Sequence, residues 1–264
     1  MIGSKRRELK YYKKIKRIVP ELYSYKDATI EHLQERAEEK GCSSLKQYYE
    51  YLKNSDEELL FLKTNLTKKG THFFRGDDWD FFNEKCLSQF AGKTDIRIWC
   101  AGCSSGEEAY STLMSILDYV ELSDVHILAT DYNDELLEKC RNGSYFNMHY
   151  EEIPEQYRKY VDKGPKKFTI NPDLMNVVTT ENIDLLKSPF PENMDIIVCR
   201  NVLKFFAPDV IAGIHVKLVQ SLRSGGFLFV SSDGDEKNKH AEYIQDPERL
   251  DMIQIEDRSI FRKK

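Results

Sequence analysis

The sequence lacks long apolar runs, and none of its segments approaches the roughly 18 consecutive apolar residues that a membrane-spanning helix requires. It also lacks a secretory signal, because the opening MIGSKRREL is charged and no apolar stretch follows it. No internal repeat or low-complexity segment is present. We therefore expect a cytoplasmic protein that is not inserted into a membrane. Its 41% hydrophobic residues suffice for one substantial core and a small second one.

Cysteine is scarce and is not spaced for a disulfide framework or a metal site. Cys100 and Cys103 form a CxxC pair, which alone could be a redox pair or half of a zinc site. No second CxxC and no His-x-x-x-His supplies the missing ligands. We expect all six cysteines to be reduced thiols, and we predict no metal.

The net charge of -5 conceals a basic segment at residues 5–17, which holds eight basic residues and one acidic residue. Such a segment could contact nucleic acid or an acidic protein, or could be the solvated face of a helix. Because no other basic patch with interleaved aromatic residues occurs, we do not expect nucleic acid to be a partner.

Hydrophobic periodicity changes along the chain. Up to about residue 65 apolar residues recur at helical spacing, which predicts a small N-terminal helical domain (1–65). The remainder (66–264) alternates buried strands with amphipathic helices, which predicts a doubly wound α/β domain. A segment at about 145–182 interrupts this alternation and is expected to be an inserted subdomain, in which KKFTI and NVVTT could pair as an antiparallel ribbon. The predicted strands are 96–100, 125–130, 194–199 and 227–232, and the predicted helices are 106–120, 133–141 and 208–223.

A glycine-rich turn follows the first predicted strand, at residues 101–108. Glycines there allow a ligand to approach the backbone, but this pattern is not the GxGxxG of dinucleotide-binding proteins. A pyrophosphate at this helix start would meet Glu107 and Glu108 as like charges, so NAD and ATP are disfavoured. A sulfonium ligand that carries an ammonium group would be attracted. Alternatively, Glu107 only interacts favourably with the helix dipole.

Polar residues also follow two other predicted strands. Asp131 ends the second strand, where an acidic side chain commonly accepts hydrogen bonds from ribose hydroxyls. It could instead cap the next helix, although Asn133 could serve as that cap. Arg200 and Asn201 follow a later strand on the same side of the sheet, and alone they would be interpreted as structural.

Six motifs follow one another along the chain: THFFR (71–75), IWCAGCSSGEEAYS (98–111), ATD (129–131), RNGSYF (141–146), CRNV (199–202) and a late GGFLF. In this order and at these separations, over residues 25–235, the chain resembles the CheR-type chemotaxis receptor methyltransferases. The resemblance implies a Rossmann-like class I methyltransferase sheet, S-adenosyl-L-methionine as the cofactor and S-adenosyl-L-homocysteine as the product. It further implies a protein-glutamate O-methyltransferase that acts on helical signalling segments of methyl-accepting receptors, and we expect a monomer.

The resemblance assigns Thr71 and Arg75 to the methionyl end of the cofactor, with the Arg75 guanidinium pairing its carboxylate. Glu108 would bind the cofactor's amino group. Phe73 and Phe74, between the first two, are expected to pack in the core.

The remaining implied contacts concern the nucleoside and the methyl group. Asp131 would bind the ribose hydroxyls, and Asp184 and Leu185 would flank the adenine. Arg200 and Asn201 would line the pocket beside the methyl group. Arg75 and Asn201 are the expected catalytic residues.

The chain departs from the family pattern in several places. Lys69 stands where the family usually has Asn, and Phe205 stands where it has a tyrosine near the transferring methyl group. The segment 29–40 is acidic and would repel an acidic receptor, so the basic segment 5–17 is expected to supply the attraction. The segment around 162–165 is short, which predicts recognition independent of a C-terminal pentapeptide tether. Two alternatives stay open: a catalytically reduced protein that binds the cofactor or its product as a regulatory module, and a methyltransferase for another protein carboxylate.

Overall fold

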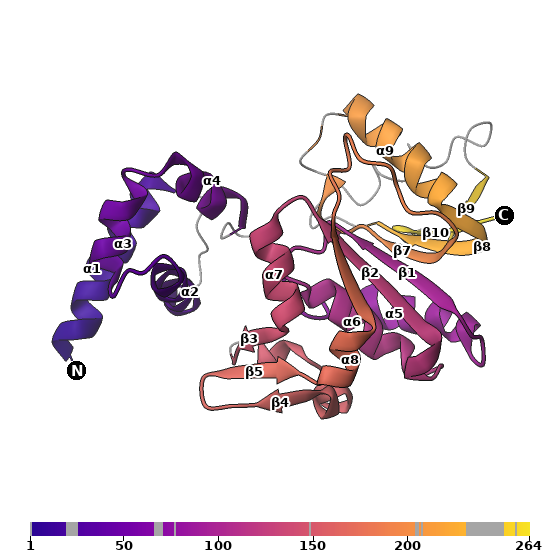
Figure 1. The fold of residues 1–264 in the computed structure, drawn as a ribbon, viewed down its shortest axis with the longest axis horizontal. Helices are drawn as coiled ribbons and strands as arrows, with labels where there is room; N and C mark the ends of the chain where they lie inside the picture. The colour runs from indigo at the N-terminus through magenta and orange to yellow at the C-terminus, as the bar shows by residue number, and fades with distance from the viewer. Residues whose placement is uncertain are drawn as a thin grey trace. The chain divides into compact units, whose positions relative to one another are not determined.

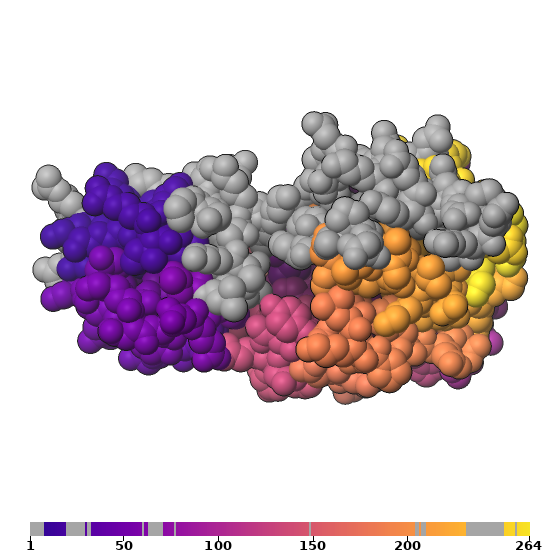
Figure 2. All heavy atoms as spheres, turned by 90° about the horizontal axis from the view of Figure 1, so that it is seen from above, coloured from indigo at the N-terminus to yellow at the C-terminus, as the bar shows by residue number. Residues whose placement is uncertain are grey.

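The computed structural model describes residues 2–19, 26–65, 71–76, 78–147, 149–203, 206, 208–230, 251–256 and 258–264. The chain forms two compact units, Met1–Thr71 and His72–Lys264, which the colours of Figures 1 and 2 distinguish. The sequence placed the domain boundary six residues earlier, after residue 65. Within the described residues, no helix is long and apolar enough to cross a membrane.

The described part of the N-terminal unit is helical, as predicted. Its core is built from buried side chains that include Tyr12, Ile15, Leu33 and Leu45. The helices are α1 (Ile2–Ile18), α2 (Lys26–Glu39), α3 (Leu45–Leu52) and α4 (Asp56–Asn65).

The described residues of the C-terminal unit form a seven-stranded sheet with the strand order β6-β2-β1-β7-β8-β10-β9. The first five strands in this order pair in parallel, and β10 is antiparallel to both of its neighbours. This arrangement confirms the predicted Rossmann-like sheet. The strands are β1 (Ile96–Ala101), β2 (Val125–Asp131), β6 (Val178–Asn182), β7 (Met194–Val198), β8 (Leu222–Phe229), β9 (Met252–Gln254) and β10 (Ile260–Lys263).

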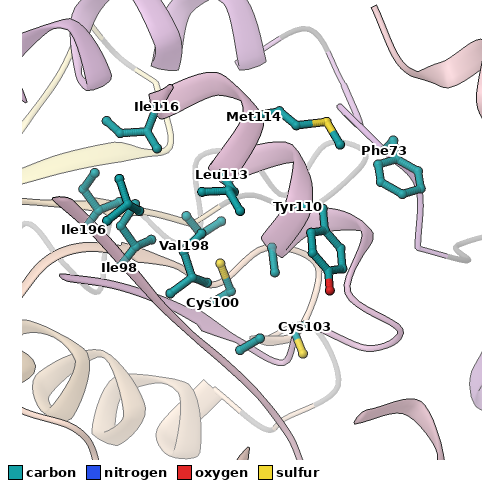
Figure 3. Close-up of a cluster of buried hydrophobic side chains, with 14 of the residues drawn as sticks. Phe73, Ile98, Cys100, Cys103, Tyr110, Leu113, Met114, Ile116, Ile196 and Val198 are labelled. Carbon is teal, nitrogen blue, oxygen red and sulfur yellow. The ribbon is translucent and has the colours of Figure 1, made fainter. Parts of the chain in front are cut away.

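Both faces of the sheet are buried because strand residues alternate between two hydrophobic clusters. In β1, Ile98 and Cys100 belong to one cluster, and Trp99 and Ala101 belong to the other. Helix α6 (Glu107–Ile116) packs on the first face, where Figure 3 shows its side chains above those of the strands. Helix α9 (Pro208–Ser221) contributes to the cluster on the second face. The other α-helices of this unit are α5 (Asp78–Lys85), α7 (Asp134–Asn142) and α8 (Pro172–Asn176).

A small second sheet lies between α7 and α8 in the sequence. It has the order β3-β5-β4, with β3 (Ser144–Phe146), β5 (Lys167–Ile170) and β4 (Val161–Lys163) all antiparallel. The predicted pairing of KKFTI with NVVTT was wrong. KKFTI pairs with β3 and β4, whereas NVVTT begins β6, which extends the main sheet in parallel beside β2.

The sheet has one point at which its strand order reverses. From β1 the chain proceeds outward to β2 and β6, and it then returns to β7 and β8 on the other side of β1. Ligands of open α/β sheets bind beyond the carboxyl ends of the strands at such a point. Gly102 follows β1, Asp131 ends β2 and Arg200 follows β7, so the topology brings all three predicted segments to this edge.

Candidate functional site

The glycine turn after β1 is fixed by hydrogen bonds to the end of β2. The backbone N–H groups of Gly102 and Cys103 both donate to the carbonyl oxygen of Thr130, at 2.7 and 2.8 Å. The next N–H, of Ser104, donates to Oδ2 of Asp131 at 3.0 Å. Three successive donors of the turn are thus satisfied within the protein, which fixes its shape.

Both glycines of this turn are required by protein contacts. Gly102 has a φ of +74°, and a Cβ atom there would lie 2.4 Å from Cγ2 of Val202. Gly106 has a φ of +98°, and its Cβ would lie 2.5 Å from Sγ of Cys140. From the sequence, we expected these glycines to allow a ligand to approach the backbone. In the structure, Val202 after β7 and Cys140 on α7 already pack too closely to leave room for a side chain.

Asp131 is buried and its carboxylate has a clear structural role. Its Oδ2 accepts from Ser104 and its Oδ1 accepts the N–H of Asn133 at 3.0 Å, while Asn133 caps α7 as predicted. Burial raises the pKa of Asp131, against the lowering effect of these backbone hydrogen bonds. Each oxygen retains a further lone pair, so the carboxylate can also accept from ribose hydroxyls. That role stays a prediction.

The two glutamates at the start of α6 differ in environment. Glu107 is buried, and the hydroxyl of Ser105 donates to both of its carboxylate oxygens at 2.9 Å. Glu108 has a side chain that is 14% exposed, with Oε2 3.6 Å from Nη1 of Arg200. Burial raises the pKa of Glu108 to about 7, although the charges of Arg200 and Arg75 act to lower it. Glu108 is therefore an acidic group that a bound cation would help to ionise.

Arg200 is a buried cation that holds the THFFR segment. Its Nη2 donates to the backbone carbonyl of Arg75 at 2.6 Å. Its guanidinium lies 4.6 Å from the ring centroid of Phe229 and 5.5 Å from that of Trp79. The structure thus gives Arg200 a positioning role that the sequence did not predict. The sequence around Arg200 does not indicate this role, because Arg75 lies 125 residues away and Trp79 and Phe229 lie on α5 and β8.

The two phenylalanines of THFFR pack in the core, as expected. Phe73 contacts Tyr145 edge-to-face at a centroid distance of 5.0 Å, and Phe74 stacks on Tyr157 at 5.0 Å. These contacts hold the two residues before Arg75 in place, so Arg75 leaves the core at a defined point and is partly exposed. Arg75 acts electrostatically on Glu108, which places these opposite charges in one neighbourhood.

The remaining predicted residues are distributed around the same edge. Asp184 and Leu185 directly follow Ile183, whose N–H donates to the carbonyl oxygen of Asp131 at 3.2 Å. Leu185 is buried, while the Asp184 carboxylate accepts the N–H of Leu186 and pairs with Lys187. Their adenine contacts stay a prediction.

Four further residues were singled out in the sequence. Asn201 follows Arg200 with a left-handed φ of 59°. Thr71 is the last residue of the N-terminal unit and is partly exposed. Phe205 lies outside the described residues, as does Lys69. The roles of Thr71 and Asn201 stay predictions.

All six cysteines are free. Cys100 is buried in β1 and Cys103 is buried within the glycine turn; Figure 3 labels both side chains. Burial raises the pKa of the Cys100 thiol well above its usual range. For Cys103, the hydrogen bond with Cys140 and burial both raise the pKa. Thiols held in the neutral form are poor nucleophiles and poor metal ligands.

The donor groups fit S-adenosylmethionine. Its amino-acid end is a zwitterion, for which Arg75 offers a cation and Glu108 an anion at one edge of the sheet. Asp131 ends the adjacent strand, where ribose hydroxyls are commonly bound. Two glutamates at the start of α6 disfavour a phosphate there. Fold and site together define a Rossmann-like, nucleoside-binding methyltransferase.

Comparisons with known proteins identify one family. Residues 69–247 match the family described as "CheR methyltransferase, SAM binding domain". The "Chemotaxis protein methyltransferase" of Borreliella burgdorferi is 31% identical over 223 residues, which are 78% of this chain and 79% of that protein. The protein of the same name from Listeria monocytogenes is 32% identical over 193 residues, 70% of this chain and 72% of that one. The chain belongs to the CheR methyltransferase family.

Membership settles the enzyme class. The expected protein-glutamate O-methyltransferase with S-adenosylmethionine as its cofactor is confirmed at the level of the family. Among solved structures, the SAM-bound methyltransferase CalS10 from Micromonospora echinaspora has a TM-score of 0.36 and 13% identity, covering 59% of this chain and 51% of that one. Similarity at that level supports no argument.

Proposed function

We propose that the protein forms γ-glutamyl methyl esters on the signalling helices of chemotaxis receptors. The observation that carries this proposal is the pair of opposite charges, Arg75 and Glu108, at the edge of the sheet where Asp131 ends β2 and the strand order reverses. The relatives' name, chemotaxis protein methyltransferase, supports the choice of acceptor.

The residues of the chain would act mainly by binding and orientation. When bound, the cofactor supplies a methyl group activated by its sulfonium. Arg75 would pair with a carboxylate and Glu108 with an ammonium, while Arg200 keeps the backbone of Arg75 in place. A glutamate acceptor with a pKa of about 4.3 is already ionised at neutral pH, so no general base is required. Asn201 would orient the acceptor, and alignment with exclusion of water lowers the barrier.

Helix α1 presents a cationic stripe that fits an acidic helical partner. Among its described side chains, the exposed ones are Lys10, Lys13 and Arg17, spaced three and four residues apart on one face. Tyr12 and Ile15 lie buried on the opposite face. On α2 the exposed Glu38 and Glu39 carry the opposite charge. We assign receptor attraction to the stripe on α1.

Recognition would not need a C-terminal peptide tether. A peptide that adds to a sheet requires an edge strand with several free backbone groups. Both edges of the small sheet, β3 and β4, have three residues each. A pull-down that depends on a receptor's terminal pentapeptide would contradict this part of the proposal. We place the reaction in the cytoplasm, with the enzyme as a monomer.

The first experiment is transfer of a labelled methyl group from S-adenosylmethionine to receptor signalling domains of the same cell. Label released as methanol by mild base establishes carboxyl methylation. Arg75→Ala should abolish transfer, and a receptor domain with its glutamates changed to alanine is the control. If the protein binds S-adenosylhomocysteine tightly and transfers nothing, the proposal fails. Gain of transfer in Phe205→Tyr would then identify a catalytically reduced binding module.

A further inference from the structure

Three side chains that the methyltransferase site does not use meet in one place. Nδ1 of His72 lies 2.7 Å from Oε1 of Glu152, and Nδ1 of His149 lies 3.1 Å from the same oxygen. The two imidazole rings are 5.9 Å apart, centroid to centroid. One ligand atom from each residue lies within 4.8 Å of the other two, and this is the one such group of His, Cys, Asp or Glu found among the described residues.

Local structure explains the convergence. His149 precedes the 3₁₀ turn Tyr150–Glu152 and is three residues from Glu152, a separation at which side chains in a 3₁₀ turn lie on the same side. His72 arrives from the start of the THFFR segment. The second oxygen of Glu152 accepts the N–H of Phe73 at 3.0 Å, which fixes the carboxylate between the two chain segments. The carboxylate of Glu152 is therefore held by both the THFFR segment and the turn that carries His149.

The spacing is close to that of a metal site. Zinc binds histidine nitrogen and carboxylate oxygen at about 2.0–2.1 Å with tetrahedral geometry, which separates adjacent ligand atoms by about 3.3 Å. The observed separations of 2.7 and 3.1 Å need only a small outward movement of His72 and Glu152 to reach that value. His149 is buried, whereas the other two side chains are about a third exposed, which leaves solvent access for a fourth ligand.

We propose that His72, His149 and Glu152 form a binding site for a divalent zinc-class metal ion, with Nδ1 of each imidazole and the carboxylate as ligands and water in the fourth position. Two histidines and one glutamate with an open position are a known zinc ligand set. The site crosslinks the start of the THFFR segment to the segment that carries the small sheet. It takes no part in methyl transfer. The competing explanation of the same geometry is a carboxylate that only bridges two imidazoles by hydrogen bonds.

Zinc titration of the full-length protein in competition with a chromogenic chelator tests the site. We expect one equivalent to bind, with an affinity reduced at least 100-fold in Glu152→Gln and in His149→Gln. His126→Gln is the matched control, since His126 is an exposed histidine paired with Asp95 at 3.5 Å and remote in sequence from the three ligands. It should bind as the wild type does. Absence of stoichiometric binding by the wild type, or equal binding by all variants, overturns the proposal.

A second measurement needs no variant and keeps the test valid if a substitution impairs folding. In the wild-type protein, cobalt at one equivalent should give the intense visible absorption of a four-coordinate ion, and zinc should abolish it. Zinc should also raise the Tm in proportion to the logarithm of its concentration, because it binds only the folded state. A weak six-coordinate cobalt spectrum with no change in Tm would leave only the hydrogen-bonded bridge. Methyl transfer enters neither measurement, so its failure would leave this result unaffected.

Discussion

Glu108 is the residue whose ionisation should control cofactor binding. Its pKa of about 7 in the free protein means that the carboxylate becomes protonated as the pH falls below 7. Only the ionised form attracts an ammonium, so the affinity for S-adenosylhomocysteine should be constant above pH 7 and fall by up to about tenfold per pH unit below it. Calorimetric titration between about pH 5.5 and about pH 8 measures this slope. Glu108→Gln should bind about tenfold more weakly at pH 8 and show no slope, and an identical slope in this variant would refute the assignment.

Gly102 should be costly to replace. Gly102→Ala places a Cβ 2.4 Å from Val202 and keeps a positive φ, so we expect a loss of about 2–4 kcal/mol in the free energy of unfolding. Val202→Ala in the same chain should restore only the part due to overlap. Gly213→Ala is the control: it lies in α9 with open space around it and should be neutral or stabilising. Urea unfolding measures all four proteins, and equal losses at both glycines would contradict the packing argument.

Residues were predicted unequally well. The identity of the charged groups at the edge of the sheet followed from their position after strands, and Asp131 and Glu108 lie where that rule puts them. The burial of Arg200 did not follow, because whether a cation after a strand faces solvent or the rings of Trp79 and Phe229 depends on the packing of distant segments. The grouping of His72 with Glu152 was equally invisible, since 80 residues separate them.

Among the elements, those with two buried faces or a clear helical period were predictable. β1, β2 and β7 are mostly apolar and mostly buried, each with a polar residue at its second position, and their predicted limits differ from the observed ones by one residue at most. β6 is mostly exposed at the edge of the sheet, so its pattern does not distinguish a parallel partner from an antiparallel one. The short strands β9 and β10 carry too few residues for a periodic signal and were not predicted.

Helix α1 supplies a prediction at this scale. Changing Lys10, Lys13 and Arg17 to Glu reverses the exposed charge of one face, and we expect the affinity for an acidic receptor domain to fall about tenfold, at about 0.5 kcal/mol for each lost pair. The loss should shrink as salt is raised, because exposed charges are screened. Surface plasmon resonance at two salt concentrations measures both effects.

A second triple variant, on the C-terminal unit, controls for the change in net charge. Lys85, Lys93 and Lys159 are exposed on the C-terminal unit, and their replacement by Glu alters the net charge equally. If this variant loses as much receptor affinity as the α1 variant, the attraction is due to net charge and the stripe has no specific role.

At the scale of the whole molecule, we expect the two units to divide cofactor binding and receptor attraction between them. Each unit has its own hydrophobic core, and Glu108, Asp131, Arg75 and Arg200 all belong to the C-terminal unit. A fragment of residues 66–264 should therefore bind S-adenosylhomocysteine within about threefold of the full chain, since the groups that carry most of the affinity are retained. It should methylate receptors at least tenfold more slowly because the stripe on α1 is missing. Calorimetry and labelled methyl transfer test the two halves of this prediction, and a fragment as active as the full chain would contradict it.

The hydrogen bonds that tie Gly102, Cys103 and Ser104 to the end of β2 have a consequence for turnover. A loop that orders only around its ligand must be reordered each time product leaves and fresh cofactor enters, and each cycle then includes that delay. Here the turn takes its shape when the sheet forms. Exchange of spent for fresh cofactor therefore requires no reordering of this turn.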